Sequence, residues 1–246
     1  MDKLIYMSMI GAQAALRAQA ANSHNLANIN TSGFRADLAA FEWQSVDGPG
    51  FKARAVGTRS ENGFSIAQGS LLPTGNGLDV AVQGDGWLAV QAPDGTEAYT
   101  RAGDLRIDPS GELRNASGRA VLGEGGPIII PPHTALNIAS NGEISIVPPG
   151  QGPEAQAIVG RIKLVNPPTT ELQRGVDGLF RLRNGGVAIT DPAVNLVSGA
   201  TEASNVNGAQ AIVNMIELSR QFEMQMKAIK SAEENSRSAG SLLSLR

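Results

Sequence analysis

The sequence predicts an α+β protein in which N- and C-terminal helices pair as a coiled-coil-like inner domain, with an antiparallel all-β middle domain inserted between them. Apolar residues recur with a period near 3.5 at both ends of the chain and with a period near 2 in the middle. All 13 prolines lie within residues 49–192, so both terminal segments are free of the residue that breaks helices. The two ends therefore belong together.

The first predicted helix covers residues 3–29. Its apolar seam is spaced alternately by four and three residues and turns polar near its end. The rest of its surface is mostly alanine, glutamine and asparagine, which suits close packing against several neighbours. The seam consists of Ile5, Met9, Ala12, Leu16, Gln19, Ser23 and Leu26.

The segment NSHNLANINTSGFR, residues 22–35, ends this helix with a dense set of polar and turn-forming residues. We expect Asn28 and Thr31 to satisfy backbone groups at the helix end, and Gly33 to adopt positive φ. Asn25 is expected to bond to a neighbouring backbone. Phe34 is expected to fill an apolar gap in this chain or in a neighbouring copy. A simple helix C-cap is the alternative, but it accounts only for the glycine.

Residues 36–71 show little periodicity and are interpreted as an extended connector, and residues 72–204 as the β-rich domain. Short alternating or apolar runs predict strands, and no helical stretch separates them as parallel crossovers would require. Turn signals such as Asn141-Gly142 lie between the runs. The predicted strands are LDVAV (78–82), WLAVQ (87–91), LRI (105–107), EISIV (143–147), RIKLV (161–165) and FRL (180–182).

The second predicted helix covers residues 208–243, about 50 Å at 1.5 Å per residue. Residues 1–35 and 205–246 are therefore expected to form the discontinuous inner domain, with the two seams facing each other. Val213, Ile216 and Met224 widen the apolar stripe and are expected to meet other subunits. The seam consists of Ile212, Met215, Ser219, Phe222, Met226 and Ile229.

Composition argues against several classes of function. The net charge of −3 offers no basic excess for nucleic acid, the absence of cysteine excludes disulfides and thiolate metal sites, and no run of 18 apolar residues exists to insert in a membrane. The N-terminus superficially resembles a signal peptide, but Asp2 offsets Lys3 and the helical pattern continues past the possible cleavage site. We therefore expect no cleavage.

No motif for catalysis, cofactor binding or metal binding emerges from the sequence, so we expect no enzyme. His24 and His133 lack a second ligand at helical spacing, and GEGGP (123–127) leads into a predicted strand, which favours a turn over a phosphate site. For Trp87 and Tyr99 we favour a role in filling the core over a role in stacking on a sugar. We interpret four aspartates as turn residues, because their spacing does not match that of a calcium-binding loop. They are Asp79, Asp85, Asp94 and Asp104.

Four blocks resemble the bacterial flagellar axial proteins, the family of rod, hook and hook-associated proteins. They are NLANINTSGFR (25–35), TGNGLDVAVQGDGWLAV (74–90), YTRAGDLRIDPSGELRNASGRAVLG (99–123) and EASNVNGAQAIVNMIELSRQFEMQMK (202–227). The opening MDKLIYMSMIGA, the length and QFEMQMK (221–227) are most similar to the proximal-rod members. One departure is His24-Asn25, where the family often has two adjacent asparagines.

The resemblance implies a structural subunit of the proximal rod in the periplasm, exported through the flagellar export apparatus without a cleaved signal. Its implied partners are copies of itself, neighbouring rod proteins and the distal rod protein. We also expect the terminal segments to be largely disordered in the monomer and to fold on assembly, because short helices gain most of their stability from packing. The candidate interface residues are Ile5, Met9, Leu16, Asn25, Leu26, Asn28, Thr31, Gly33, Phe34, Ile212, Met215, Ile216, Phe222, Met226 and Ile229.

Two other functions stay open on sequence alone. A secreted β-rich carbohydrate-binding module would use Trp87 and Tyr99 and would require a measurable ligand. A glycan hydrolase would use a pair of carboxylates that the sequence does not single out. Signal cleavage would also be required of the binding module, whereas activity that survives loss of both terminal helices would favour the hydrolase.

Overall fold

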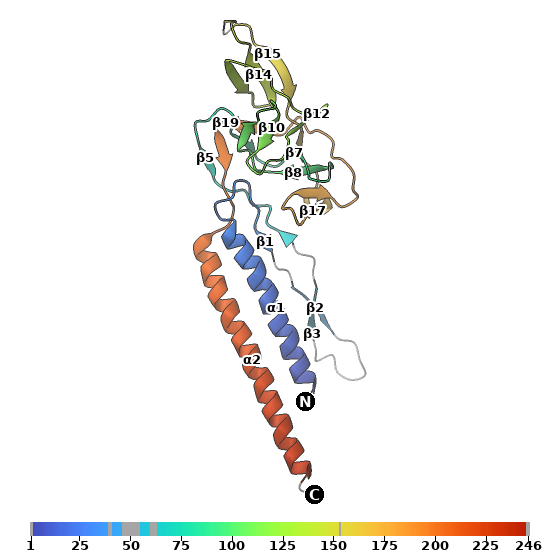
Figure 1. Cartoon of the computed structure of the whole chain (residues 1–246). Coiled ribbons are helices and arrows are strands. Elements are labelled where there is room, and N and C mark those ends of the chain that lie inside the picture. Colours follow the sequence, from blue (N-terminus) through green and yellow to red (C-terminus); the bar gives the residue numbers. More distant parts are fainter. Residues whose placement is uncertain (1, 39–40, 46–54, 60–62, 153, 245–246) are drawn as a thin grey trace. The chain divides into compact units, whose positions relative to one another are not determined.

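The computed structural model describes residues 2–38, 41–45, 55–59, 63–152 and 154–244 of the 246-residue chain (Figure 1). The chain forms two compact units, each built from separate stretches of sequence. Unit 1 comprises Met1–Ile29, Ala36–Ser65 and Val206–Arg246, and unit 2 comprises Asn30–Arg35 and Ile66–Asn205. Terminal helices in contact and an antiparallel β middle domain confirm the predicted α+β class.

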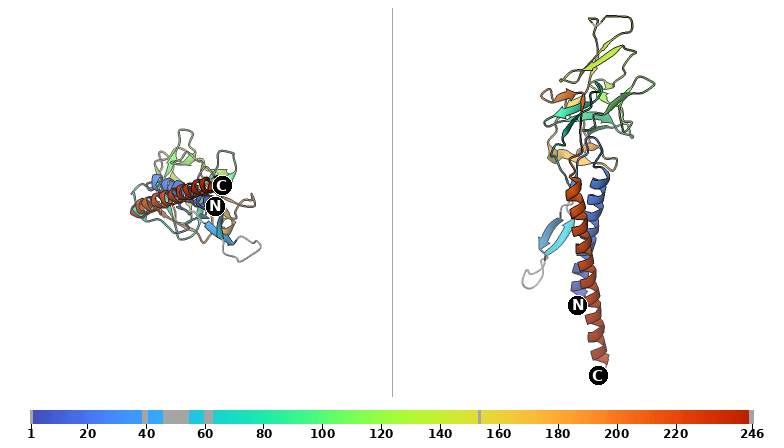
Figure 2. Two further views of the ribbon diagram at one scale, coloured as in Figure 1. Left: turned by 90° about the horizontal axis from the view of Figure 1, so that it is seen from below. Right: turned by 90° about the vertical axis from the view of Figure 1, so that its left-hand side faces the viewer.

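Two long helices dominate unit 1, α1 (Asp2–Ala27) and α2 (Gly208–Ser244). They run side by side in the views of Figures 1 and 2, and their bounds agree with the predicted spans to within two residues. Near the end of α1 the Asn22 amide donates to the carbonyl of Ala211 near the start of α2, over 2.7 Å. Further along, Gly11 lies against the side chain of Gln225. The pair is therefore antiparallel.

The face that α1 presents to α2 differs in part from the predicted seam. The buried side chains of the two helices are small or polar, and several of the larger apolar residues of the seams stand about half exposed. Small residues occupy the face between α1 and α2 because they let the two backbones approach closely. The buried set is Ser8, Ala12, Ala15, Asn22, Ala211 and Ala232, and the half-exposed set is Met9, Leu16, Ile212 and Met226.

Unit 1 also holds two antiparallel strand pairs, which lie within the segment interpreted as an extended connector. β1 (Asp37–Leu38) pairs with β4 (Gly63–Phe64), and β2 (Phe41–Ser45) pairs with β3 (Ala55–Arg59). Both β1 and β3 contact α1. Residues 39–40, 46–54 and 60–62 of the predicted connector lie outside the described residues.

Every strand pairing in unit 2 is antiparallel, which confirms the prediction for the middle domain. A five-stranded sheet has the order β16-β7-β8-β18-β17, and a three-stranded sheet has the order β13-β14-β15. The elements are β5 (Leu71–Pro73), β6 (Val80–Gln83), β7 (Trp87–Gln91), β8 (Glu97–Thr100), β9 (Leu105–Ile107), β10 (Leu113–Asn115), β11 (Leu122–Gly123), β12 (Gly126–Pro127), β13 (Ala135–Ile138), β14 (Glu143–Val147), β15 (Ala157–Arg161), β16 (Leu164–Val165), the 3₁₀ turn η1 (Thr169–Glu171), β17 (Leu172–Arg174), β18 (Phe180–Leu182), β19 (Asn195–Ser198) and β20 (Ala200–Glu202).

Strands with alternating side chains supply the core of unit 2. Leu88 and Val90 from β7 meet Ile144 and Ile146 from β14 in one apolar cluster, because residues two apart in a strand share a face. Tyr99 is fully buried and Trp87 nearly so, which confirms their predicted core role. The GEGGP stretch forms the turn of the β11–β12 hairpin, as predicted.

Candidate functional site

The helix residues expected to meet other subunits divide into two groups by exposure. Members of the first group are about half exposed in the single chain, and members of the second are partly covered within unit 1. The half-exposed group is Met9, Leu16, Ile212, Ile216 and Met226, together with Val213 and Met224. The partly covered group is Ile5, Leu26, Met215, Phe222 and Ile229. These helices thus carry a surface of apolar side chains, which we call the helix surface and define by the half-exposed group.

The asparagines at the end of α1 bond within their own chain. Asn25 exchanges two hydrogen bonds with the backbone of Asp37 in β1, donating over 2.9 Å and accepting over 2.7 Å. His24 Nδ1 lies 2.6 Å from a carboxylate oxygen of Asp37, and Asn28 donates to the His24 carbonyl over 2.9 Å. Asn25 therefore acts as an internal tie between α1 and the strand that follows it in unit 1.

The turn at residues 30–35 belongs to unit 2. Gly33 adopts φ +65° as predicted, and its N–H donates to the Glu202 carbonyl over 2.7 Å. Phe34 is buried, and the Arg174 guanidinium lies 4.5 Å from its ring centroid. Arg174 also donates to the Arg35 carbonyl over 2.9 Å. The gap that Phe34 fills is thus inside its own chain, whereas Thr31 is exposed.

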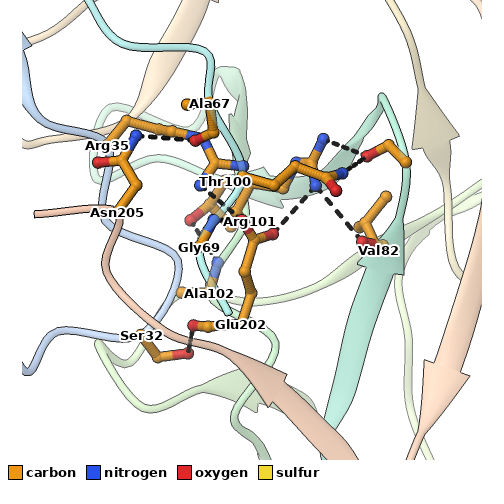
Figure 3. A network of polar contacts seen from close by, with 12 residues as sticks. Ser32, Arg35, Ala67, Gly69, Val82, Thr100, Arg101, Ala102, Glu202 and Asn205 are labelled. Atoms are coloured by element: carbon orange, nitrogen blue, oxygen red, sulfur yellow. Dashed lines mark hydrogen bonds and ion pairs between the residues drawn. The ribbon is translucent and has the colours of Figure 1, made fainter. Parts of the chain in front are cut away.

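A buried charge cluster of Arg35, Arg101 and Glu202 lies beside this turn (Figure 3). The Glu202 carboxylate lies 2.6 Å from Arg35 Nη1 and 3.0 Å from Arg101 Nη1, and the three side chains are only 1–3% exposed. The same carboxylate accepts the N–H of Gly69 over 2.9 Å. Arg101 further donates to the carbonyl of Gly84 over 2.8 Å.

The cluster carries two cations and one anion, so it buries a net positive charge. Burial lowers the pKa of Arg101 and the nearby Arg35 lowers it further, whereas the attraction of Glu202 raises it. Both guanidinium groups face the ring of Trp87, at 5.9 Å for Arg35 and 5.4 Å for Arg101. Within the described part of the chain, Arg35 Nη2 and Arg101 Nε have no hydrogen-bond partner. The electron-rich face of Trp87 offsets part of that cost.

Sequence reasoning did not single out the members of this cluster. Arg35 and Glu202 both stand within blocks of family resemblance, but an arginine or a glutamate in a polar turn usually faces solvent. The positions of the two residues could have predicted the contact. Arg35 ends the block that follows the first predicted helix, and Glu202 begins the block that contains the second. Opposite charges next to two helices that are expected to pair suggest an ion pair.

The described residues show neither a membrane-spanning helix nor a group of acidic and histidine side chains able to hold a metal. They carry exposed apolar side chains on the helices of unit 1 and a structural ion-pair cluster in unit 2.

Two family models match the chain. Residues 197–242 match the model described as flagellar basal body rod FlgEFG protein C-terminal, and residues 81–146 match the flagellar hook protein FlgE/F/G D1 domain. The first match spans the end of β19, all of β20 and most of α2. The second begins inside β6 and ends in β14.

Curated relatives align over most or all of this chain. The flagellar basal-body rod protein FlgF of Salmonella typhimurium is 45% identical, and that of Escherichia coli K12 is 44% identical, each over 100% of both chains. The flagellar basal-body rod protein FlgG of Buchnera aphidicola from Acyrthosiphon pisum is 33% identical, over 86% of this chain and 88% of its own.

Proposed function

The chain belongs to the family of the flagellar basal-body rod protein FlgF, and from this premise we propose that it assembles helically through the helix surface as a subunit of the proximal rod. It is a structural subunit of the flagellar basal-body rod and not an enzyme. Membership of this family implies assembly with other rod subunits. We propose that the helix surface makes those contacts.

The observation that carries the proposal is the exposure of large apolar side chains on both helices. Ile216 and Met224 are 50% and 60% exposed in the single chain. Because each such side chain is already about half covered, complete covering contributes roughly 1–1.5 kcal/mol. Head-to-tail contacts that do not close into a ring generate a helical filament. Such a filament of stiff helices is suited to transmit torque across the periplasm.

We further propose the partners and the route of assembly. The subunit meets copies of itself, neighbouring proximal-rod proteins and the distal rod protein FlgG. It leaves the cytoplasm through the flagellar export apparatus without signal cleavage, and its terminal segments fold when neighbours cover the helix surface. Support comes from the small, weakly apolar contact face between α1 and α2, since a lone helix pair with such a face gains little from packing.

Substitution on the helix surface tests the proposal. Ile216→Asn and Met224→Asn are each expected to lower incorporation into rods by at least about tenfold, because each removes an apolar side chain from the interface. The measurement is the amount of the variant in basal bodies purified from cells that lack the native chain. Gln221→Asn, at another exposed position on α2, is the matched control and should assemble normally.

Thermal melting of unit 2 should be unchanged in all three variants, because none of these residues belongs to it. Normal incorporation of both Ile216→Asn and Met224→Asn would contradict assembly through this surface.

A further inference from the structure

Three stretches that are distant in sequence meet at Glu202 within unit 2 (Figure 3). The stretch after α1 contributes Arg35 and Gly33, which contact the carboxylate and the carbonyl of Glu202. The stretch before β5 contributes the N–H of Gly69. The stretch before α2 contributes Glu202 itself. One residue therefore holds together the points where the chain enters and leaves the unit.

Additional hydrogen bonds fix the same stretches. The Asn205 N–H donates to the Phe34 carbonyl over 3.3 Å, and its side-chain amide donates to the Ala67 carbonyl over 2.8 Å. The Ser32 hydroxyl donates to the Glu202 carbonyl over 3.3 Å. Every one of these contacts lies inside unit 2 and needs no helix of unit 1.

Breaking a buried ion pair by removal of one partner is strongly destabilising, since an uncompensated charge stays behind. Glu202 is the only anion of the cluster, and it serves two arginines at once. Loss of one partner is therefore expected to release the stretches at Arg35, Arg101 and Glu202 together. A frayed chain end would instead open one residue at a time.

We propose that the buried charge cluster is a clasp that stays closed in the unassembled subunit, so that the folded part of the monomer is unit 2, which comprises Asn30–Arg35 and Ile66–Asn205. This inference rests on the proposed assembly-coupled folding of the helices. It states where the folded part of the monomer ends and the unfolded segments begin. The turn at residues 30–35, which the sequence assigned to the disordered end, is on this view part of the folded monomer.

The clasp also prepares the helices to pair. Asn22 and Ala211 are 189 positions apart in sequence. In a folded unit 2 with an open clasp, the pairing of Leu71 with Glu202 shortens the flexible path between them to about 58 residues. With Gly33 held against Glu202, the path falls to about 20 residues. Because the entropic cost of closure rises with the logarithm of loop length, the clasp increases the effective concentration of one helix near the other roughly 5-fold.

Amide hydrogen exchange on the full-length monomer tests the clasp. We expect residues 30–35 and 200–205 to exchange as slowly as strands β7 and β8, while residues 5–27 and 210–238 exchange fast. Fast exchange at residues 30–35, equal to that of α1, would overturn the proposal. Slow exchange of both helices in a verified monomer would overturn assembly-coupled folding instead, so the two failures are distinguishable.

A variant shows whether the ion pair is responsible. Arg35→Met should speed exchange at residues 30–35 and 200–205 by at least about 100-fold, as expected for the loss of one partner of a buried pair. Lys163→Met is the matched control, because Lys163 makes a mostly buried ion pair with Glu97, at 2.9 Å to both oxygens, elsewhere in unit 2. The control should not release these two segments selectively.

A milder variant covers the case in which Arg35→Met unfolds all of unit 2. Ser32→Ala removes one hydrogen bond to Glu202 and should speed exchange about 3- to 10-fold at residues 30–35 and 200–205 alone. Unchanged exchange there in Ser32→Ala, or selective release by Lys163→Met, would contradict the clasp.

Discussion

Gly33 shows how much depends on a single residue in the turn that follows α1. Its φ of +65° is in the left-handed region, and a Cβ built on it would overlap the backbone of Arg101 and Ala102. Backbone atoms directly after strand β8 cannot move aside as a flexible side chain can. Only glycine therefore permits the close approach that brings the N–H of Gly33 to Glu202.

Gly33→Ala should destabilise unit 2 by at least about 3 kcal/mol, because left-handed strain is added to a backbone overlap. Urea unfolding of the purified chain, followed by tryptophan fluorescence, measures the loss. Gly75→Ala is the control: φ there is +73°, but a Cβ meets nothing within 4 Å, so about 1 kcal/mol is expected. Equal losses in both variants would mean that the close approach contributes nothing.

The positive φ of Gly33 could be predicted from Thr-Ser-Gly, because turn chemistry is local. The burial of Arg35 could not, because it depends on Glu202 and Trp87, which are distant in sequence. A residue that pairs across the fold leaves little trace in its immediate neighbours.

Among the elements of unit 2, β8 fixes the loop that follows β18. The Tyr99 hydroxyl lies 3.0 Å from a carboxylate oxygen of Glu97, and it accepts the N–H of Ala188 over 2.7 Å. Lys163 Nζ binds the same carboxylate. Burial raises the pKa of Tyr99 to about 12 from its ordinary value of 10, with Glu97 adding to the rise and the Ala188 bond opposing it.

Because the folded-state pKa is raised, the neutral tyrosine stabilises unit 2 fully below pH 10, and this contribution is lost as the pH rises to about 12. Tyr99→Phe should cost roughly 1–3 kcal/mol at neutral pH, since the buried Ala188 N–H loses its acceptor. Stability curves at pH 8, 10 and 12 measure both effects. A difference between native chain and variant that does not shrink above pH 10 would contradict this account.

Helices and strands could be predicted where the sequence carries a strong local pattern of apolar and polar residues. Four predicted strands coincide with β7, β9, β14 and β18, because alternation or apolar runs between turn signals mark them clearly. Two-residue strands such as β11 and β12 carry no such pattern and were not predicted. The seam of α1 is displaced in part because the pattern emphasises large apolar residues. Ala12 is buried as predicted, but Ser8 and Ala15 are buried in place of Met9 and Leu16.

At the scale of the whole molecule, the two units are expected to differ in stability. Unit 2 has an extensive apolar core, whereas the helix pair of unit 1 buries mainly small side chains. Calorimetry of the monomer should therefore show one transition of on the order of 100 kcal/mol near 60 °C, which is the enthalpy of unit 2 alone. Circular dichroism should record low helix content before that transition.

An enthalpy of about 170 kcal/mol would instead mean that all 246 residues melt together. A chain truncated after residue 205 is the control, and its transition should keep the same enthalpy as that of the full chain.

The α+β class and the pairing of the helices could be predicted because periodicity and proline placement act over long stretches. The division of residues 30–35 from α1 could not, because it is made by contacts with residues near position 202.

The gathering of the chain crossings at Glu202 has an evolutionary consequence. Gly33, Arg35 and Gly69, which stand near these crossings, all contact Glu202, so the ends of the stretches that form unit 2 lie close together. Segments whose ends lie close together can be exchanged, lengthened or removed with little effect on the remainder of a protein. Exchanges and insertions within unit 2 are therefore expected to be tolerated while the terminal helices stay unchanged.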